Sequence, residues 1–376
     1  MGEASKKIPN RMRICILTQP LGANFGGILQ AYALQKALKD MGHDVTTLRF
    51  SPQATWWIPS GLFKKWALTV RRFFSKYLKG NKGIIYCNPD RQTRYAFQEL
   101  NRFINENIEH MDVQAPLTHG ALPDFDAYVV GSDQVWRPAY SPFLPNFYLD
   151  FVAGSTSKRI AYAASFGVDT WEADEETTTL IQGLAKRFDA ITVREESGVE
   201  LCQSFLGVQA AVMPDPTLLL SADDYLQLCA RNLQEQVDYI AAYILDQNDQ
   251  VRSFVARMAA QLHLPVKYIG KFDWSTGVDS VESWISGIAN ARYVITDSFH
   301  GTVFSLLFKK DFFSLINHER GASRFESLLD TVGLHDHLLD KHTLEVLPIW
   351  PEIPWDSVSA KMEEMQQKGL RFLNSI

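Results

Sequence analysis

The chain has 376 residues, which suits two domains because a single hydrophobic core rarely grows beyond about 250–300 residues. Hydrophobic residues make up 46% of it and charged residues 21%, and no apolar run approaches the roughly 20 residues of a membrane helix, so we expect a globular protein that does not span a bilayer. A net charge of −6 and a pI near 5.9 exclude a general positive field, and we expect no nucleic-acid partner.

The first part of the chain alternates short aliphatic strands with helical patterns, which is typical of α/β layers around parallel sheets. We expect a buried strand at 13–18, then a helix within 26–45 that ends at Gly42, and a second strand at 45–50. Further units in which a strand leads into a turn are predicted at 126–133, 159–167, 190–195 and 209–217.

Segment 54–88 differs from the acidic average of the chain, because it contains seven basic residues and no acidic one, with apolar residues at helical spacing between them. A basic amphipathic helix of this kind can lie on an anionic membrane surface, where a lipid-linked glycan would be found. The alternative is an insertion whose aromatic side chains pack on the first domain and whose basic residues are solvated. The basic residues are Lys64, Lys65, Arg71, Arg72, Lys76, Lys79 and Lys82.

A domain boundary is expected near 216–222, because Pro214 and Pro216 surround an aspartate and interrupt backbone hydrogen bonding. The α/β pattern then starts again. We therefore predict an N-terminal domain of residues 12–218 and a C-terminal domain of residues 219–376. In the second domain we expect strands at 239–245, 266–270, 293–298 and 311–316, helices around 249–263 and 281–291, and a last helix at 357–376 that packs back on the body of the protein.

The cysteines are far apart, with no CxxC pair and no His/Cys cluster at the spacing of metal ligands. We expect a reduced, cytoplasmic chain without a metal site. Residues 1–11 lack the apolar stretch of a secretory signal, and the fold is expected to begin at Met12. The cysteines are Cys15, Cys87, Cys202 and Cys229.

Ligands of open α/β sheets bind at the carboxyl ends of the strands, and several polar clusters of the sequence fall there. Asn24, Gly26 and Gly27 precede the first helix, where backbone N–H groups can approach an anion; a purely structural turn is the alternative. Ser132 and Asp133 follow the strand "YVV" and either cap a helix or contact a ligand.

The stretch "TDSFHGTVFSLLF", residues 296–308, places His300 where a strand changes into a helix. The imidazole and the N–H groups of Gly301 and Thr302 would then lie at a helix N-terminus, where the helix dipole favours anions. A histidine in this place can donate a hydrogen bond to a phosphate. The structural alternative is a histidine that only caps the turn.

Six motifs follow one another along the chain: "NFGGILQAYAL", "GSDQVW", "YAASFG", "VREESG", "PDPTLLL" and "TDSFHGTVFSLLF". With these motifs the chain resembles the polysaccharide pyruvyl transferase family, from about residue 13 to about residue 335. The resemblance implies a GT-B-like α/β fold of two Rossmann-type domains facing a cleft. It implies phosphoenolpyruvate as co-substrate with no further cofactor, a pair of sugar hydroxyls as acceptor, and a pyruvate ketal on a cell-surface polysaccharide or its precursor. A divalent ion on the phosphate is an open alternative.

The family's His-Gly turn falls on His300 and Gly301, but Ser298 stands where members of known activity often carry an arginine. Another cation must then bind the phosphate or the carboxylate of the donor, and the candidates are Arg194, Lys271 and Arg324. The full set of donor-binding residues that we predict is Ser298, His300, Gly301, Thr302, Arg194, Lys271 and Arg324.

The expected reaction needs an acid, a base and stabilisation of the phosphate charge. We predict that His300 binds the phosphate or protonates it as it leaves, and that either Asp133 or Glu195 accepts the proton of the sugar hydroxyl. Two other functions remain open: a GT-B glycosyltransferase that uses a nucleotide sugar, and a non-catalytic carbohydrate-binding relative. The predicted acceptor-binding residues are Asn24, Gly26, Gly27, Ser132, Asp133, Gln134, Trp136 and Ser165.

Overall fold

The computed structural model describes residues 11–22, 24–50, 97–141, 143–152, 156–230, 238–273, 277–316 and 321–376, and the structural statements below concern these residues. The predicted basic helix at 54–88 lies outside the described residues, so its contact with a membrane stays a prediction. No helix in the described part of the chain is long and apolar enough to cross a membrane.

The first half forms a seven-stranded sheet in which every neighbouring pair is parallel. Its strand order, β3-β2-β1-β4-β5-β6-β7, is that of a Rossmann sheet. The strands are β1 (Arg13–Leu17), β2 (Asp44–Phe50), β3 (His110–Val113), β4 (Ala127–Val130), β5 (Lys158–Ala164), β6 (Ala190–Val193) and β7 (Ala211–Val212). Its helices are α1 (Phe25–Asp40), α4 (Gln98–Asn107), α5 (Glu175–Ala185) and α6 (Glu196–Leu201), with short turns of helix at η1 (Leu144–Tyr148) and η2 (Cys202–Leu206).

The second half forms a five-stranded parallel sheet in the order β14-β13-β12-β8-β9. With β8 counted as its first strand the order is 2-1-3-4-5, the other common doubly wound arrangement. The strands are β8 (Ile240–Tyr243), β9 (Val266–Tyr268), β12 (Tyr293–Thr296), β13 (Asp311–Ile316) and β14 (Leu338–Asp340), and a hairpin of β10 (Phe272–Asp273) and β11 (Gly277–Val278) lies beside them in the sequence. The helices are α7 (Ala222–Leu228), α8 (Asp249–Leu262), α9 (Val281–Ala289), α10 (Phe299–Leu307), α11 (Ser323–Val332) and α12 (Trp355–Asn374), with short turns at η6 (His335–His337) and η7 (Lys341–Thr343). The short turn η3 (Pro216–Leu219) lies where the chain leaves the first half, and its Leu219 packs with the β1 residues Ile14 and Ile16.

These two sheets confirm the predicted α/β class with two Rossmann-type halves. The predicted strands are all present, and the helix that follows β1 ends as expected, with Gly42 at a φ of 94°. The edge strands β3 and β14 were not predicted, because neither has the apolar run that marks the buried central strands. The exact domain boundaries of 12–218 and 219–376 stay a prediction.

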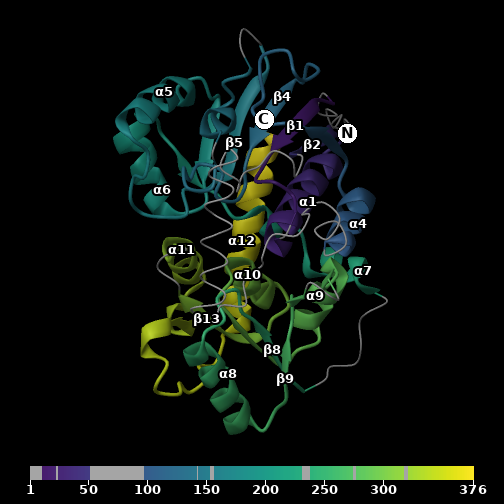
Figure 1. Cartoon of the computed structure of the whole chain (residues 1–376), viewed down its shortest axis with the longest axis vertical. Coiled ribbons are helices and arrows are strands. Elements are labelled where there is room, and N and C mark those ends of the chain that lie inside the picture. Colours follow the sequence, from purple (N-terminus) through teal and green to yellow (C-terminus); the bar gives the residue numbers. More distant parts are fainter. Residues whose placement is uncertain are drawn as a thin grey trace, which may run out of the picture.

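Residues of both halves pack together in one of the hydrophobic core clusters. Phe25, at the start of α1, stacks on Trp284 of α9 with ring centroids 5.6 Å apart, and both side chains are buried. Figure 1 shows α1 between the first sheet and the helices of the second half. Because α1 packs on both halves, it fixes the first sheet against the second.

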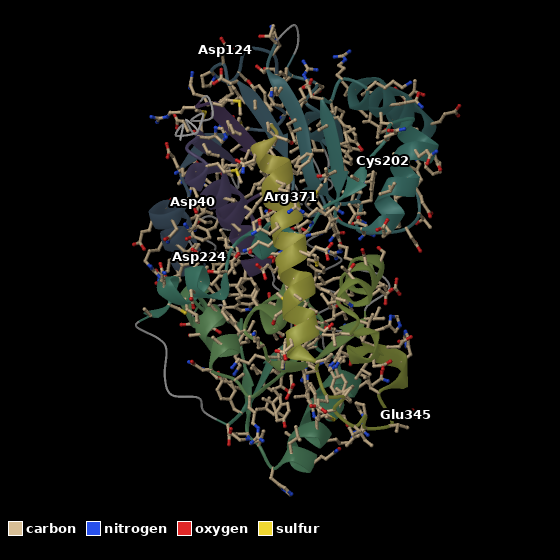
Figure 2. All side chains as sticks on the ribbon, turned by 180° about the vertical axis from the view of Figure 1, so that it is seen from behind. Asp40, Asp124, Cys202, Asp224, Glu345 and Arg371 are labelled. Carbon is tan, nitrogen blue, oxygen red and sulfur yellow. The ribbon has the colours of Figure 1, made fainter. Side chains whose placement is uncertain are left out.

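The last helix, α12, begins beside the second half and ends on the first sheet (Figures 1 and 2). Leu373 is 1% exposed in a core cluster with the β1 residues Ile14 and Ile16. The Gln366 amide donates a hydrogen bond of 3.0 Å to the backbone oxygen of Leu219 in η3. The chain therefore returns to its first half after it has built the second.

Candidate active site

The two sheets bring their ligand-binding edges together. In each sheet the strand order reverses at one place, between β1 and β4 in the first and between β8 and β12 in the second. Ligands of doubly wound sheets bind outside the carboxyl ends of the strands at such a point. The turn 131–134 follows β4, and the turn that carries His300 follows β12.

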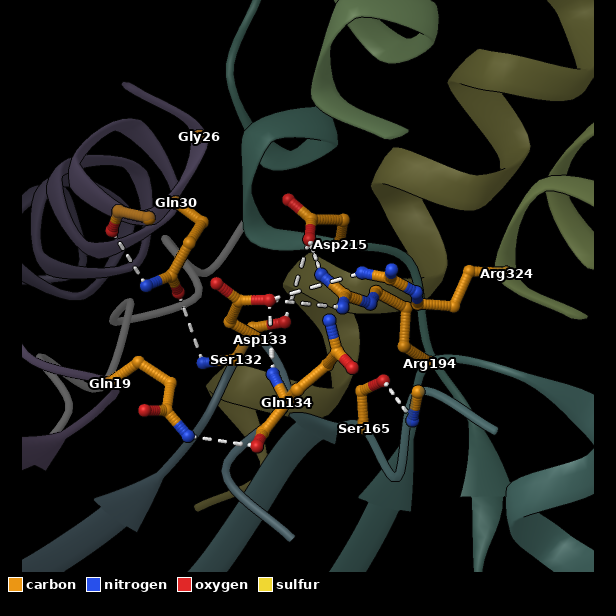
Figure 3. Close-up of polar contacts among 12 residues, drawn as sticks. Gln19, Gly26, Gln30, Ser132, Asp133, Gln134, Ser165, Arg194, Asp215 and Arg324 are labelled. Carbon is orange, nitrogen blue, oxygen red and sulfur yellow. Dashed lines mark hydrogen bonds and ion pairs between the residues drawn. The ribbon is translucent and has the colours of Figure 1, made fainter. Parts of the chain in front are cut away.

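Five charged or titratable residues meet here, and we call them the charged cluster: Asp133, Arg194, Asp215, His300 and Arg324. Arg194 Nη1 lies 2.6 Å from Asp215 Oδ2, and Arg194 Nη2 lies 3.4 Å from Asp133 Oδ1. Arg324 Nη1 lies 4.0 Å from the same Asp133 oxygen (Figure 3). Two guanidinium groups and two carboxylates thus face one another, and none of the five residues is more than 8% exposed.

His300 reaches the cluster from the first turn of α10. Its Nε2 lies 3.5 Å from Asp215 Oδ2, and this buried nitrogen has no hydrogen-bond partner among the described residues. The other side of the ring faces α1, where a Cβ added to Gly26 would lie 1.9 Å from His300 Nδ1. The imidazole therefore lies between a carboxylate and a glycine of the first half, although its own helix belongs to the second.

Asp215 is held in place as the N-cap of η3. Its Oδ1 accepts hydrogen bonds from the backbone N–H of Thr217 at 3.0 Å and from the Thr217 hydroxyl at 2.7 Å. Sequence reasoning used this aspartate only as the centre of a proline-rich domain boundary. Asp215 follows the strand β7 and lies in the motif "PDPTLLL", and this position was a signal that could have placed it in the site.

The charges of the cluster stabilise one another. Burial alone would raise the pKa of Asp215, but the charges of His300 and Arg194 outweigh it and hold that pKa well below its usual range. Burial would also raise the pKa of Asp133, but the charges of Arg194, His300 and Arg324 outweigh this effect and lower that pKa. Burial, together with the charge of Arg194, lowers the pKa of Arg324 to about 10. Both aspartates are therefore ionised at neutral pH.

Two glutamine side chains fix the turn 131–134: Gln30 comes from α1, and Gln19 follows β1. Gln30 Oε1 accepts a hydrogen bond from the N–H of Ser132 at 3.1 Å, and Gln19 Nε2 donates to the backbone oxygen of Gln134 at 2.8 Å (Figure 3). Asp133 adopts a φ of 68°, a left-handed conformation that aspartate tolerates better than most residues. The backbone thus presents Asp133 to the two arginines.

Glu195 is fully buried and supports a neighbouring turn. Its Oε1 accepts hydrogen bonds from the Ser165 hydroxyl at 2.9 Å and from the N–H groups of Phe166 at 2.8 Å and Gly167 at 3.1 Å. Of the two predicted bases, the structure brings Asp133 into the charged cluster, whereas Glu195 is bonded to the turn 165–167.

Ser298, Gly301 and Thr302 form the capped start of α10. The Ser298 hydroxyl accepts from the Gly301 N–H at 3.4 Å, and the Ser298 backbone oxygen accepts from the Thr302 N–H at 3.0 Å. The Thr302 hydroxyl lies 2.6 Å from the Ser314 hydroxyl. The N–H groups that were expected to face a phosphate are thus engaged within the helix cap in this structure.

Among the predicted acceptor residues, Asn24 accepts a hydrogen bond from the Gly26 N–H at 3.0 Å and caps α1. A Cβ added to Gly27 would make only ordinary van der Waals contacts, the nearest at 3.6 Å. The Gln134 side chain lies against Gly167 and within 3.3 Å of Arg137 Nη1.

Two predicted site residues lie outside the charged cluster. Trp136 is 1% exposed, stacks on Tyr148 with ring centroids 4.9 Å apart, and donates to the backbone oxygen of Phe147, so it packs in the core of the first half. Lys271 is exposed beside the edge strand β9, where its Nζ lies 5.8 Å from the Tyr268 ring centroid. It is not in the charged cluster, because β8 separates β9 from the strand that leads to His300.

The model of the polysaccharide pyruvyl transferase family matches residues 24–319. No curated protein sequence matches the chain.

Solved structures match over most of the chain at low identity. A UDP-GlcNAc 2-epimerase from Neisseria meningitidis has 10% identity and a TM-score of 0.45, with 96% of this chain and 94% of that one covered. A protein of uncharacterised function from Klebsiella pneumoniae has 10% identity and a TM-score of 0.43, with 86% and 91% covered. A heptosyltransferase from E. coli, solved with ADP, has 13% identity and a TM-score of 0.38, with 94% and 100% covered.

Proposed function

Because the chain belongs to the polysaccharide pyruvyl transferase family, we propose that it moves a pyruvyl group from phosphoenolpyruvate to two hydroxyls of a sugar and forms a pyruvate ketal. The acceptor is a cell-surface polysaccharide or its precursor. The observation that supports this proposal most is the charged cluster, in which two guanidinium groups and an imidazole lie at the switch points of both sheets. Phosphoenolpyruvate carries a phosphate and a carboxylate, the groups that arginine binds best.

The arginine that relatives carry two residues before the histidine is replaced by Ser298, and we assign its role to Arg324. This side chain comes from α11, so it approaches the cluster from a different element of the same half. Both Arg194 and Arg324 lie over the ring of Phe299, at 4.8 and 5.6 Å from its centroid. The shared ring holds the two guanidinium groups side by side, where one can bind the donor phosphate and the other its carboxylate.

The reaction divides into proton transfers that the cluster can serve. Protonation of the methylene carbon makes the neighbouring carbon electrophilic, and a sugar hydroxyl adds there and loses its proton. Phosphate then leaves with the electrons of its C–O bond, and the second hydroxyl closes the ketal. We assign the base to Asp133, because its lowered pKa keeps it ionised, and the protonation of the leaving phosphate to His300, because its Nε2 lies in the cluster without a hydrogen-bond partner among the described residues.

The proposal is tested by turnover with a defined donor. The wild-type protein, His300→Ala and His337→Ala are incubated with phosphoenolpyruvate and a glycan panel, and phosphate release and ketal formation are followed by mass spectrometry. His337 is a matched control, because it is a buried histidine that bonds to the backbone oxygen of Phe312 outside the cluster. We expect turnover in the wild type and His337→Ala and its loss in His300→Ala. Transfer from a nucleotide sugar, with none from phosphoenolpyruvate, would contradict the proposal and identify a glycosyltransferase.

A further inference from the structure

Asp215 uses its two oxygens differently. Oδ1 is anchored by both donors of Thr217, whereas Oδ2 lies 2.6 Å from Arg194 Nη1 and 3.5 Å from His300 Nε2. The Ser132 hydroxyl lies 3.5 Å from the same oxygen. One oxygen thus fixes the carboxylate to its own backbone, and the other fills the space between a cation of the first half and the imidazole of the second.

The groups that surround Oδ2 have capacity for more hydrogen-bond partners. Arg194 Nε and His300 Nε2 are buried and have no hydrogen-bond partner in the described part of the chain. A buried polar nitrogen without a partner is unfavourable. Asp215 Oδ2 bonds to Arg194 Nη1 and lies 3.5 Å from His300 Nε2, which leaves Arg194 Nε without an acceptor in the described residues. A phosphate group offers three acceptor oxygens to the same nitrogens.

A bound donor anion must use the same groups that Asp215 occupies. Arg194 is 5% exposed, and the ion pairs that it makes in the described residues are with Asp133 and Asp215, so an arriving phosphate competes with Asp215 for it. Two anions at contact distance repel each other strongly in a buried site. The shortest ion pair of the cluster, between Arg194 and Asp215, is therefore the contact that a phosphate has to replace.

We propose that Asp215 is a positioning residue whose Oδ2 takes the place of a donor phosphate oxygen while the site is empty, and that phosphate binding displaces it from Arg194. The identity of the donor rests on the proposed function; the competition for Arg194 does not. While the site is empty, Asp215 keeps Arg194 and His300 in position. It therefore lowers the affinity for the anion and maintains the geometry that turnover needs.

The test is the affinity for inorganic phosphate and for phosphoenolpyruvate, measured by calorimetry on the wild type, Asp215→Asn and Asp340→Asn. Asp340 is a matched control, because it caps the short helix η7 with its carboxylate as Asp215 caps η3, but at the end of the edge strand β14. In Asp215→Asn we expect phosphate to bind at least about tenfold more tightly, because the competing charge is gone, and turnover to fall. In Asp340→Asn we expect the wild-type affinity.

Unchanged or weaker phosphate binding in Asp215→Asn would overturn the inference, since a residue with a purely structural role cannot raise affinity when it is lost. Tighter phosphate binding without pyruvyl transfer to any acceptor would support the inference and remove the proposed function. Pyruvyl transfer by the wild type, together with unchanged phosphate affinity in Asp215→Asn, would support the proposed function and overturn the inference.

Loss of one partner of a buried ion pair is strongly destabilising, so Asp215→Asn can fail to fold. In that case a structure of the wild-type protein with phosphate decides the question. We expect the Arg194 Nη1 to Asp215 Oδ2 distance to grow from 2.6 Å to beyond the range of an ion pair, with a phosphate oxygen in its place. Phosphate bound while that contact stays intact would overturn the inference.

Discussion

His300 and Asp215 show how single residues join the two halves. Each begins or caps a helix at the end of a strand, so the backbone fixes its side chain with little freedom. Asp215 is bonded within the first half, whereas His300 comes from the second half and lies between Asp215 and Gly26 of the first. The site therefore exists only where the two sheets meet, and single substitutions should separate binding from folding.

The role of Arg324 can be tested by a substitution that keeps its charge. In Arg324→Lys we expect the Michaelis constant for phosphoenolpyruvate to rise about tenfold, roughly 1.4 kcal/mol, because lysine lacks the planar fork that binds two oxygens. Steady-state kinetics with varied donor measures this. Lys271→Ala is the control and should keep wild-type constants, because Lys271 lies outside the cluster. A larger effect at Lys271 than at Arg324 would reverse the assignment.

The pH dependence of stability follows from the lowered pKa of Asp133. The pKa of Asp133 in the folded protein lies below the ordinary value of 3.8. Above that pH the ionised carboxylate contributes its full stabilisation. As the pH falls further, the unfolded chain takes up the proton first, and the contribution to stability declines. Urea unfolding of the wild type between pH 5 and pH 3 should show a steeper loss of unfolding free energy than in Asp133→Asn, by up to about 1.4 kcal/mol per pH unit. Equal slopes would contradict this reading.

Sequence reasoning identified the strand-end residues of the cluster but not all of their partners. Asp133, Arg194 and His300 were predicted because each follows an aliphatic strand, where the backbone turns toward a ligand. Asp215 was missed because its flanking prolines also mark a domain boundary. The burial of Trp136 was not predicted, because a tryptophan in a polar motif is indistinguishable, in sequence, from one that packs in the core.

At the scale of elements, the start of α1 is shaped by the approach of α10. A Cβ at Gly26 would lie 1.9 Å from His300 Nδ1, whereas a Cβ at Gly27 would find its nearest neighbour at 3.6 Å. The sequence showed two adjacent glycines before a helix and could not tell them apart. Only the packing of α10, which comes much later in the chain, distinguishes the required Gly26 from the replaceable Gly27.

Substitution of the two glycines should therefore have opposite results. In Gly26→Ala the imidazole or the helix must shift, and we expect a loss of about 1–3 kcal/mol in the free energy of unfolding together with a loss of donor turnover. In Gly27→Ala we expect unchanged turnover and a gain of up to about 1 kcal/mol, since alanine is the better helix former. Thermal unfolding and kinetics on both variants measure these effects. Equal behaviour of the two would contradict the close approach.

At the scale of the whole molecule, α12 is the element that ties the end of the chain to its beginning. Leu373 is 1% exposed among residues of the first sheet, and we expect Leu373→Ala to lower the free energy of unfolding by about 2–5 kcal/mol. Lys368→Ala, on the exposed side of the same helix, should change it by less than about 0.5 kcal/mol. Urea unfolding compares the two. A small effect at Leu373 would mean that the helix contributes little to the first half.

The architecture was more predictable than the contacts between its parts. Two successive α/β patterns predicted two parallel sheets, because hydrophobic periodicity reports on local burial. The same periodicity does not report which face of α1 meets the second half, since α1 is buried by both halves along much of its length. The contact of Phe25 with Trp284 depends on that arrangement and could not be derived from either pattern alone.

The return of α12 also means that the two halves are connected twice. The chain passes from the first half to the second just after Asp215 and comes back through α12, and these two passages lie side by side where Gln366 bonds to Leu219. A break in the chain after Leu219 would therefore leave the first half without the end of α12, whose Leu373 packs beside Ile14 and Ile16. The first half alone would thus lack part of its own hydrophobic core.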